Sequence, residues 1–482
     1  MKQPLFLGRE QELEHLNLLR NRGLANLVVV RGRRRIGKST LIEKFAENSY
    51  FLEFAGLPPD SEEVVTAQDQ RDSFAKQLSK QFRLPKMQIT DWADLFSLLA
   101  KHIKRRKVTI LFDEISWMAT GDPLFLGKLK NAWDLEFSKN PNLMLVLCGS
   151  VSTWIEKNIV NSKSFYGRVS LFIKLTELPL YHCHSLLMGQ NFKRSILEEF
   201  MILSITGGVP WYLNHVQGKM SAEENIRRLC FQEDGILFND FERIFTDIFD
   251  KRAKIYRPIV QVLSQGILEL TDICKALNYP KSGTLSEYLD DLIRAGFVTR
   301  DYTWLIESGK SSRLSHYRLS DNYLRFYLRY IEPSRDAITR GRFNVRALSS
   351  FPGWYSIMGL QFENLVLKNR EKIWQLLGIR PEDIVADNPY FQRKTSQHPG
   401  VQIDYLIQTR TNTLFACEIR FSREPLGASI IQECQEKLKR LVLPRRFSAW
   451  PVLIHVSGVQ ESVLDSGFFA HIIDFSTILH EH

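Results

Sequence analysis

One stretch of the sequence has the residue types and spacing needed to hold the phosphates of a nucleotide. An apolar run, Leu27–Val30, leads into the loop GRRRIGKS, which starts at Gly32, and then into a segment with helical character. Glycines let successive backbone N–H groups turn toward a triphosphate, and the helix N-terminus adds partial positive charge. We expect the lysine to reach the β- and γ-phosphates and the serine to hold Mg²⁺. The predicted nucleotide-binding residues of this stretch are Gly32, Ile36, Gly37, Lys38, Ser39 and Thr40.

Two later apolar segments end in polar residues that could complete this site. The segment KVTILFDEIS, which starts at Lys107, ends a strand in Asp113 and Glu114. We expect Asp113 to hold the water shell of Mg²⁺ and Glu114 to polarise a water molecule against the γ-phosphate. Another apolar segment, Leu143–Cys148, is followed by Gly149 and Ser150. Ser150 could position the attacking water, although a serine at such a place is also common in turns.

A second group of carboxylates lies near the C-terminal end. Asp404 stands in the strand VQIDYLI and Glu418 in the strand TLFACEIR. A hairpin of these strands could bring both carboxylates to one edge, where they could share a divalent metal with Glu363 from a preceding helix. Arg420, two residues after Glu418, points to the same face and could stabilise a phosphorane. Acids in strands are, however, often ordinary surface positions.

These residues need a parallel sheet to bring them together. Strands and helices alternate in the first part of the chain, which predicts a parallel sheet covered by helices on both faces. The acidic pair is not on the next strand after the phosphate loop, which indicates that another strand lies between them. The predicted strands are Leu27–Val30, Tyr50–Phe54, Val108–Phe112, Leu143–Cys148 and Leu171–Leu175. The predicted fold class is therefore α/β with several domains.

The rest of the chain divides into three further predicted parts. Residues 1–180 form the nucleotide-binding core, and residues 181–249 read as a helical lid with Gly207, Gly208 and Pro210 between two helices. Residues 250–335 resemble a winged helix, and residues 336–482 a second α/β unit. The helix that would enter a DNA groove carries Glu287, Asp290 and Asp291, so that repulsion from phosphates favours a packing role over DNA recognition.

The composition limits the classes of protein that this chain could represent. The 482 residues are too many for one core, and no apolar run approaches the length of a membrane span. The six cysteines are scattered without a C-x-x-C pair, which indicates a reducing cytoplasm and argues against structural zinc. The net charge of +10 suits a polyanionic partner such as DNA, although plain surface basicity would also explain it. We expect no membrane association and a cytoplasmic location.

Together, these features resemble the archaeal-type P-loop ATPases of the AAA+/STAND division. The segment FLGRE at residues 6–10 is similar to the box on the adenine side, so the resemblance implies roles for Gly8 and Arg9 in nucleotide binding. Gly32–Ser39 corresponds to Walker A, Asp113-Glu114 to Walker B, and Ser150 to the first sensor. The resemblance further implies that Arg168 is an arginine finger acting on a neighbouring subunit, so that the protein forms a homo-oligomer. Pro210 belongs to a segment that resembles the lid motif touching the adenine.

The C-terminal part resembles the restriction-endonuclease-like PD-(D/E)xK domain that often follows in this family. Glu363, Asp404 and Glu418 correspond to its acidic positions, and Arg420 stands where active nucleases usually have lysine. The expected activity is ATP hydrolysis with Mg²⁺, coupled to action on DNA through this domain, which could use Mn²⁺. The alternative is a STAND-type signalling or assembly ATPase whose inactive C-terminal domain binds protein partners.

Overall fold

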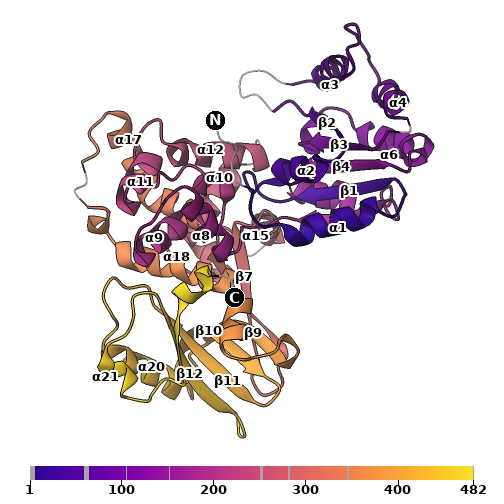
Figure 1. Ribbon diagram of the computed structural model, residues 1–482. Coiled ribbons are helices and arrows are strands. Elements are labelled where there is room, and N and C mark those ends of the chain that lie inside the picture. The colour runs from indigo at the N-terminus through magenta and orange to yellow at the C-terminus, as the bar shows by residue number, and fades with distance from the viewer. Residues whose placement is uncertain are drawn as a thin grey trace. The chain divides into compact units, whose positions relative to one another are not determined.

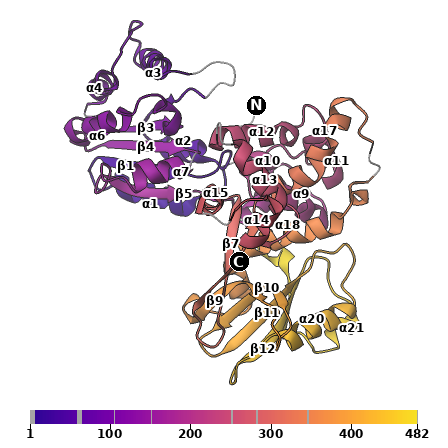
Figure 2. The ribbon, with the colours of Figure 1, turned by 180° about the vertical axis from the view of Figure 1, so that it is seen from behind.

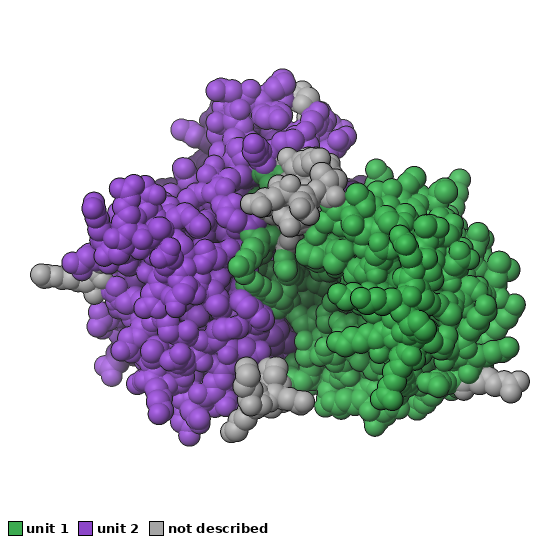
Figure 3. All heavy atoms as spheres, turned by 90° about the horizontal axis from the view of Figure 1, so that it is seen from above, with its two compact units in different colours: residues 1–177, 243–253 green, residues 178–242, 254–482 purple. Residues whose placement is uncertain are grey.

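The chain folds into two compact units, coloured separately in Figure 3. Unit 1 contains residues 1–177 and 243–253, and unit 2 contains residues 178–242 and 254–482. The computed structural model describes residues 6–58, 65–104, 106–150, 152–249, 253–280, 283–344 and 347–480. All the predicted site residues lie within these ranges.

Unit 1 is built on a five-stranded parallel sheet in the order β2-β3-β4-β1-β5 (Figure 1). Strand β4 pairs with β1 on one side and β3 on the other, so the predicted inserted strand is present and the predicted fold class is confirmed. The three central strands β3, β4 and β1 are buried on both faces, as a parallel sheet covered by helices requires. The strands are β1 (Asn26–Arg31), β2 (Tyr50–Ala55), β3 (Val108–Asp113), β4 (Leu143–Gly149) and β5 (Val169–Lys174).

Helices cover both faces of this sheet. Helix α1 lies along β1, and α3 and α4 lie beyond β2 and β3, as the two opposite views show (Figures 1 and 2). Phe54, Phe74, Trp92, Phe96 and Phe112 form an aromatic core between the sheet and the helices that follow β2. The helical segments are α1 (Glu10–Arg20), α2 (Lys38–Ala46), α3 (Ala67–Phe82), α4 (Trp92–Ile103), α5 (Ile115–Met118), α6 (Phe125–Leu135), η1 (Phe137–Lys139), α7 (Ser152–Ile155) and η2 (Glu156–Val160).

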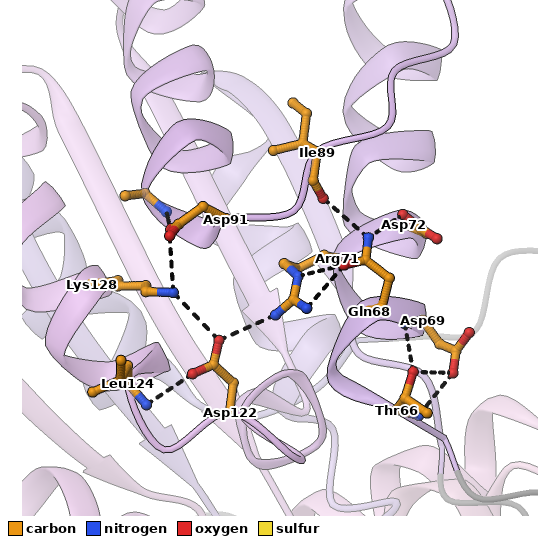
Figure 4. A network of polar contacts seen from close by, with 11 residues as sticks. Thr66, Gln68, Asp69, Arg71, Asp72, Ile89, Asp91, Asp122, Leu124 and Lys128 are labelled. Atoms are coloured by element: carbon orange, nitrogen blue, oxygen red, sulfur yellow. Dashed lines mark hydrogen bonds and ion pairs between the residues drawn. The ribbon is translucent and has the colours of Figure 1, made fainter.

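A polar network fastens the outer helices to the segment after β3 (Figure 4). The carboxylate of Asp122, between α5 and α6, contacts Arg71 of α3 at 3.2 Å and Lys128 of α6 at 3.6 Å. Lys128 also contacts Asp91 at 3.2 Å, and Asp91 caps α4 by accepting from the N–H of Ala93. Three helices therefore share one set of ion pairs beside the aromatic core.

Unit 2 begins with a group of helices. Helix α9 ends at Thr206, Gly207 follows as its cap, and Pro210 opens α10, as the sequence predicts. The helices are α8 (Leu180–Gly189), α9 (Ile196–Thr206), α10 (Pro210–Leu213), α11 (Ala222–Cys230) and α12 (Ile236–Phe249), the last of which continues into unit 1.

Three helices and a small antiparallel sheet follow. The sheet has the order β6-β8-β7, and Asp291 of α15 accepts a hydrogen bond from the hydroxyl of Tyr256 in α13 at 2.7 Å. Glu287 and Asp290 are exposed on α15. The elements are α13 (Ala253–Leu263), β6 (Leu268–Glu269), α14 (Leu270–Ala276), α15 (Gly283–Arg294), β7 (Val298–Trp304) and β8 (Ser311–Leu319), followed by α16 (Asn322–Phe326), η4 (Tyr327–Ile331), α17 (Glu332–Thr339) and η5 (Leu348–Ser350).

The C-terminal part contains a mixed sheet in the order β13-β12-β11-β10-β9. Strands β9, β10 and β11 run antiparallel, while β11, β12 and β13 run parallel, with α20 as the crossover between β11 and β12. Strands β9 and β13 were not among the predicted elements. The elements are α18 (Trp354–Lys368), α19 (Arg370–Leu376), η6 (Pro381–Asp383), β9 (Ile384–Gln392), β10 (Val401–Thr409), β11 (Thr413–Ile419), α20 (Ser429–Arg440), β12 (Ser448–His455), α21 (Glu461–Leu464), β13 (His471–Asp474) and η7 (Phe475–Leu479).

The cysteines and the apolar character of the helices can also be compared with the sequence. All six cysteines lie in the described ranges, are buried and form no disulfide. None of the helices in the described part of the chain combines the length and apolar character that crossing a membrane requires.

Candidate functional site

The phosphate loop connects the end of β1 to the start of α2. A Cβ on Gly32 would come within 2.6 Å of the carbonyl oxygen of Leu175, so only glycine lets the loop pass the end of β5. Gly37 has φ 92°, a conformation that side chains other than glycine rarely adopt. Lys38 is buried, and its Nζ donates to the carbonyl of Arg33 at 3.2 Å, across the loop. The loop therefore has its lysine already inside the turn that would surround a phosphate.

The predicted magnesium residues are in direct contact. The hydroxyl of Ser39 donates to Oδ2 of Asp113 at 2.8 Å, although the two residues are 74 positions apart. Oδ1 of Asp113 accepts from the N–H of Glu114 at 3.0 Å. Burial raises the pKa of Glu53 on the neighbouring β2, and the charge of Asp113 adds to this rise. A hydroxyl and a carboxylate side by side at the start of a phosphate-binding helix are ligands that suit Mg²⁺.

Glu114 and Ser150 form a second direct contact. One carboxylate oxygen of Glu114, Oε2, accepts from both the N–H and the hydroxyl of Ser150, at 3.0 and 2.9 Å. Glu114 has φ 51°, in the left-handed region, at the point where β3 gives way to α5. Ser150 is buried directly after β4, the strand next to β3. The side chain predicted to position water therefore holds the carboxylate predicted to activate it.

Arg9 joins the N-terminal segment to the phosphate loop. Its Nη2 donates to the carbonyl of Thr176 at 2.6 Å and to that of Ile36 at 3.4 Å. Gly8 and Arg9 both have positive φ, at 74° and 70°, immediately before α1. The structure thus brings the segment expected on the adenine side against the backbone of the loop.

Arg168 forms an ion pair within its own subunit. Its guanidinium donates twice to Asp134, from Nε at 2.7 Å and from Nη2 at 2.8 Å. Hydrogen bonding to Arg168 lowers the pKa of Asp134 to about 2. Two apolar side chains beside this pair are highly exposed: Tyr166 at 86% and Leu135 at 63%. The structure does not relate Pro210 to the loop, because Pro210 belongs to the other unit.

The C-terminal carboxylates face each other across the β10–β11 pair. Tyr405 is paired with Cys417, which sets Asp404 opposite Glu418, and Oδ2 of Asp404 accepts from the N–H of Ile419 at 3.0 Å. Nζ of Lys437, from α20, lies 2.6 Å from Glu418 and 3.4 Å from Asp404. The hairpin predicted from the sequence is therefore present, and an ammonium group lies between its two carboxylates.

Further charges surround these three groups. Arg420 contacts Glu418 at 2.6 Å and also pairs with Glu433 of α20. Burial, and then the charge of Asp404, raise the pKa of Glu363 to about 8. The same two causes raise the pKa of Glu418. Burial would lower the pKa of Lys437, but the charges of Asp404 and Glu418 outweigh it, so this pKa is raised.

The predicted three-carboxylate metal site is not assembled as a chelate in this arrangement. Among the described residues, no group of three or more His, Cys, Asp or Glu side chains is arranged to hold a metal ion. Lys437 and Arg420 balance the charge of the carboxylates instead, and a metal ion would have to displace Lys437. Sequence reasoning missed Lys437, because it lies 19 residues after Glu418 on a helix, with no fixed spacing to either carboxylate.

Comparisons with known proteins agree with the site in unit 1. Residues 6–216 match a family described as an ATPase domain predominantly from Archaea. The uncharacterised protein MJECL04 of Methanocaldococcus jannaschii is 27% identical over 368 residues, which is 75% of this chain and 76% of that protein. The uncharacterised ATP-binding protein MJ0423 of the same organism is 50% identical over 44 residues, 9% of this chain and 75% of that protein.

A solved structure shows the same fold. The Walker-type ATPase PABY2304 of Pyrococcus abyssi superposes with a TM-score of 0.50 at 14% sequence identity, covering 67% of this chain and 96% of that chain. At this identity the likeness concerns the fold alone. With the phosphate loop, the Ser39–Asp113 contact and the family match, we conclude that residues 6–216 carry an archaeal-type ATPase domain of the P-loop class.

Proposed function

We propose that this protein binds ATP with Mg²⁺ and hydrolyses it, with Glu114 as the general base. The contact between Ser39 and Asp113 carries the proposal, because these side chains would hold the ion at the phosphate loop. The bound ion would neutralise charge on the phosphates during transfer. Lys38 binds the terminal phosphates, Arg9 fixes the loop, and Glu114 takes a proton from water. Ser150 acts as a positioning residue for Glu114.

Two substitutions test this assignment. Lys38→Ala should abolish ATP binding, because it removes the buried cation of the loop. Glu114→Gln should bind ATP yet turn over roughly a hundredfold more slowly, since it removes the base and keeps the metal ligands. Glu47→Gln, an exposed position just after α2, serves as a control that should behave like the wild type. Wild-type hydrolysis by Glu114→Gln would rule out this residue as the base.

We further propose that the ATPase acts on DNA, with residues 250–335 as a winged helix and residues 336–482 as a nuclease-like domain. Lys437 supports the second part. Active nucleases usually have a lysine where this chain has Arg420, and Lys437 places an ammonium group beside the same two carboxylates. In this proposal Lys437 stabilises charge on the phosphodiester while Asp404 and Glu418 hold Mg²⁺ or Mn²⁺. The exposed acids of α15 would repel DNA phosphates, so in this proposal other surfaces contact the DNA.

The nuclease proposal has a direct test. Plasmid, linear duplex and single-stranded DNA are incubated with the protein and either metal, and cleavage is followed on gels. Asp404→Ala and Lys437→Met should both abolish cleavage, while Lys439→Met, an exposed lysine two residues further along α20, should not. If the wild type cuts none of these substrates, the domain is not a nuclease.

The second candidate function is a STAND-type signalling or assembly ATPase with an inactive C-terminal domain. The ion pairs that Lys437 and Arg420 form with Glu418 favour it, because they occupy the carboxylate that a metal would need. In that case ATP should change the oligomeric state, measured by light scattering, while DNA affinity should be absent. Salt-dependent DNA binding would instead favour the first proposal.

A further inference from the structure

Three aromatic side chains form a cluster on one face of the β9–β13 sheet. Phe415 of β11 is in register with Trp450 of β12, and their ring centres are 5.8 Å apart. His471 of β13 lies 6.4 Å from Trp450, with the two rings inclined by only 24°. The three residues come from adjacent strands of one sheet, seen at the lower end of Figure 1. We call this group the aromatic platform.

The platform is open to solvent where an aromatic group would normally be covered. Trp450 is 44% exposed, while Phe415 beside it on β11 is buried. Indole is among the most highly buried side chains on average, and exposing this much apolar surface opposes folding. An exposed tryptophan held between rings on the two neighbouring strands offers a face on which another ring can stack.

The segment that leads into β12 is basic. Residues 441 to 460 contain no aspartate or glutamate, while their arginines are Arg445 and Arg446. Arg445 and Arg446 are exposed in the turn just before β12, four or five residues from Trp450, a distance of about 13–17 Å along an extended chain. Among the described residues, neither arginine forms an ion pair.

A third arginine reaches the same end of the sheet from the neighbouring turn. The N–H of Ser448 donates to the carbonyl of Asn412 at 3.1 Å, which holds the β10–β11 turn against the start of β12. Arg410 is exposed in that turn. Its backbone N–H donates to the carbonyl of Asp383, whose carboxylate is already paired with Arg380 at 2.9 Å. Three arginines from two adjoining turns therefore lie at one end of the strands that carry the platform.

The platform is separate from the carboxylate cluster. Side chains of a strand alternate between the two faces, so Phe415 and Glu418, three residues apart on β11, point to opposite faces. Lys437 of α20 reaches Glu418 on one face, whereas Phe415, Trp450 and His471 lie on the other. A ligand on the platform would leave the carboxylates uncovered.

We propose that the aromatic platform, with Arg445 and Arg446, binds single-stranded nucleic acid. A base stacks on Trp450, and the arginines contact the phosphates on either side of it. Unpaired bases are required, because the bases of a duplex are stacked on one another and cannot lie flat on the indole. The site extends the proposed action on DNA by naming the form of strand that is bound, and it does not depend on ATP hydrolysis or cleavage.

The charge decides between this ligand and a protein partner. A protein surface that covers Trp450 would leave three arginines without counter-charges unless it were strongly acidic, whereas each nucleotide supplies one phosphate beside each base. Self-association of this face would bring the arginines of two copies together, which is unfavourable at low salt. A protein partner and self-association would each give a result different from the binding of single strands.

Fluorescence anisotropy of a labelled oligothymidylate of about 12 nucleotides tests the proposal on the full-length protein. Trp450→Ala should weaken binding roughly tenfold, whereas Trp450→Phe should retain most of it, because a benzene ring still stacks. Arg445→Ala/Arg446→Ala should weaken binding and reduce its dependence on salt concentration. The matched controls are Tyr355→Ala, an aromatic residue of α18 that is 57% exposed, and Arg423→Ala, an exposed arginine outside the platform.

Three results would overturn the proposal. The first is no binding of single strands by the wild type, and the second is equal binding by the wild type and Trp450→Ala. The third is a dimer in the ultracentrifuge that Trp450→Ala dissociates, without oligonucleotide binding. Unchanged thermal unfolding and ATP hydrolysis in Trp450→Ala would establish that the variant is folded. Asp404→Ala separates the two sites: loss of cleavage with normal strand binding supports both, while strand binding without any cleavage supports the platform alone.

Discussion

At the scale of single residues, the main finding is that Ser150 holds Glu114. The carboxylate oxygen that accepts from the hydroxyl also accepts from the backbone N–H of the same serine. A general base works only when its orientation is maintained, and these bonds from the neighbouring strand maintain it. In the proposed mechanism Ser150 would therefore act through Glu114.

Ser150→Ala should lower the turnover of ATP roughly tenfold and leave ATP affinity unchanged. The substitution removes the hydroxyl but keeps the backbone N–H, so the loss should be smaller than for Glu114→Gln. Steady-state kinetics separate the two quantities, because a positioning defect appears in kcat and a binding defect in KM. Ser150→Thr, which retains the hydroxyl, should restore part of the rate. A variant with wild-type kcat would show that the hydroxyl is dispensable.

A second residue-scale prediction concerns His455, at the end of β12. Burial lowers its pKa, and its Nδ1 accepts from the N–H of Gly458 at 3.2 Å, which requires the unprotonated ring. The unfolded chain therefore takes up a proton near pH 6.5 that the folded protein resists. The contribution to stability is complete above this pH and is lost as the pH falls through the lower folded pKa.

The melting temperature should therefore drop by a few degrees between pH 7.5 and pH 5.5, and His455→Asn should reduce this drop. Asparagine keeps an acceptor near Gly458 but cannot take a proton. Differential scanning calorimetry at the two pH values measures the effect. His398→Asn, in the exposed loop between β9 and β10, is the control and should keep the wild-type drop.

At the scale of elements, the network around Asp122 determines how α3 and α6 are held in unit 1 (Figure 4). Asp122 is largely buried between Arg71 and Lys128, with side-chain exposures of 10, 14 and 21%. Removal of the shared carboxylate leaves two partly buried cations with fewer partners, which costs more than the loss of an exposed ion pair.

Asp122→Ala should reduce the free energy of unfolding of unit 1 by about 2 kcal/mol. Urea denaturation followed by the fluorescence of the tryptophans reports on it, since Trp92 lies in the adjoining core. Lys44→Ala breaks an exposed pair with Glu47 and should change stability by well under 1 kcal/mol. Similar losses in both variants would mean that the network contributes no more than a surface pair.

At the scale of the whole molecule, the arginine-finger role that the family resemblance implies for Arg168 would need a second copy of the chain. Arg168 is paired with Asp134, so it would have to leave this partner to contact a neighbour's γ-phosphate. The exposed Tyr166 and Leu135 beside the pair are apolar surface that a neighbouring subunit could cover.

Mixing Arg168→Ala with Lys38→Ala should restore part of the ATPase activity that each variant lacks alone. In a mixed oligomer an intact phosphate loop meets an intact arginine at some interfaces, which neither pure variant can offer. Phosphate release measured over a range of protein concentrations tests this, with each variant alone at the total concentration as the control. Full wild-type activity in a strictly monomeric preparation would contradict the trans role.

The part of the site that could be predicted is the part whose residues are close together in the chain. Gly32 to Ser39 are consecutive residues of one loop that leads into a helix. Asp113 and Glu114 come at the end of an apolar strand. Local sequence sets these geometries, because a strand, a glycine-rich turn and a helix start specify where each side chain points. The sequence also predicted a strand between β1 and β3, and β4 lies there. The prediction was possible because parallel α/β sheets bring the ends of their strands to one edge.

Other features were decided only by the tertiary structure. Lys437 enters the carboxylate cluster because α20 crosses over the β10–β11 pair, Arg168 finds Asp134 from a different element, and Trp450 meets His471 across two strands. Each of these contacts joins residues whose separation in the chain carries no periodic or motif signal. A sequence determines which groups are available and how each short segment folds, but the packing of distant segments determines which charges and rings become neighbours.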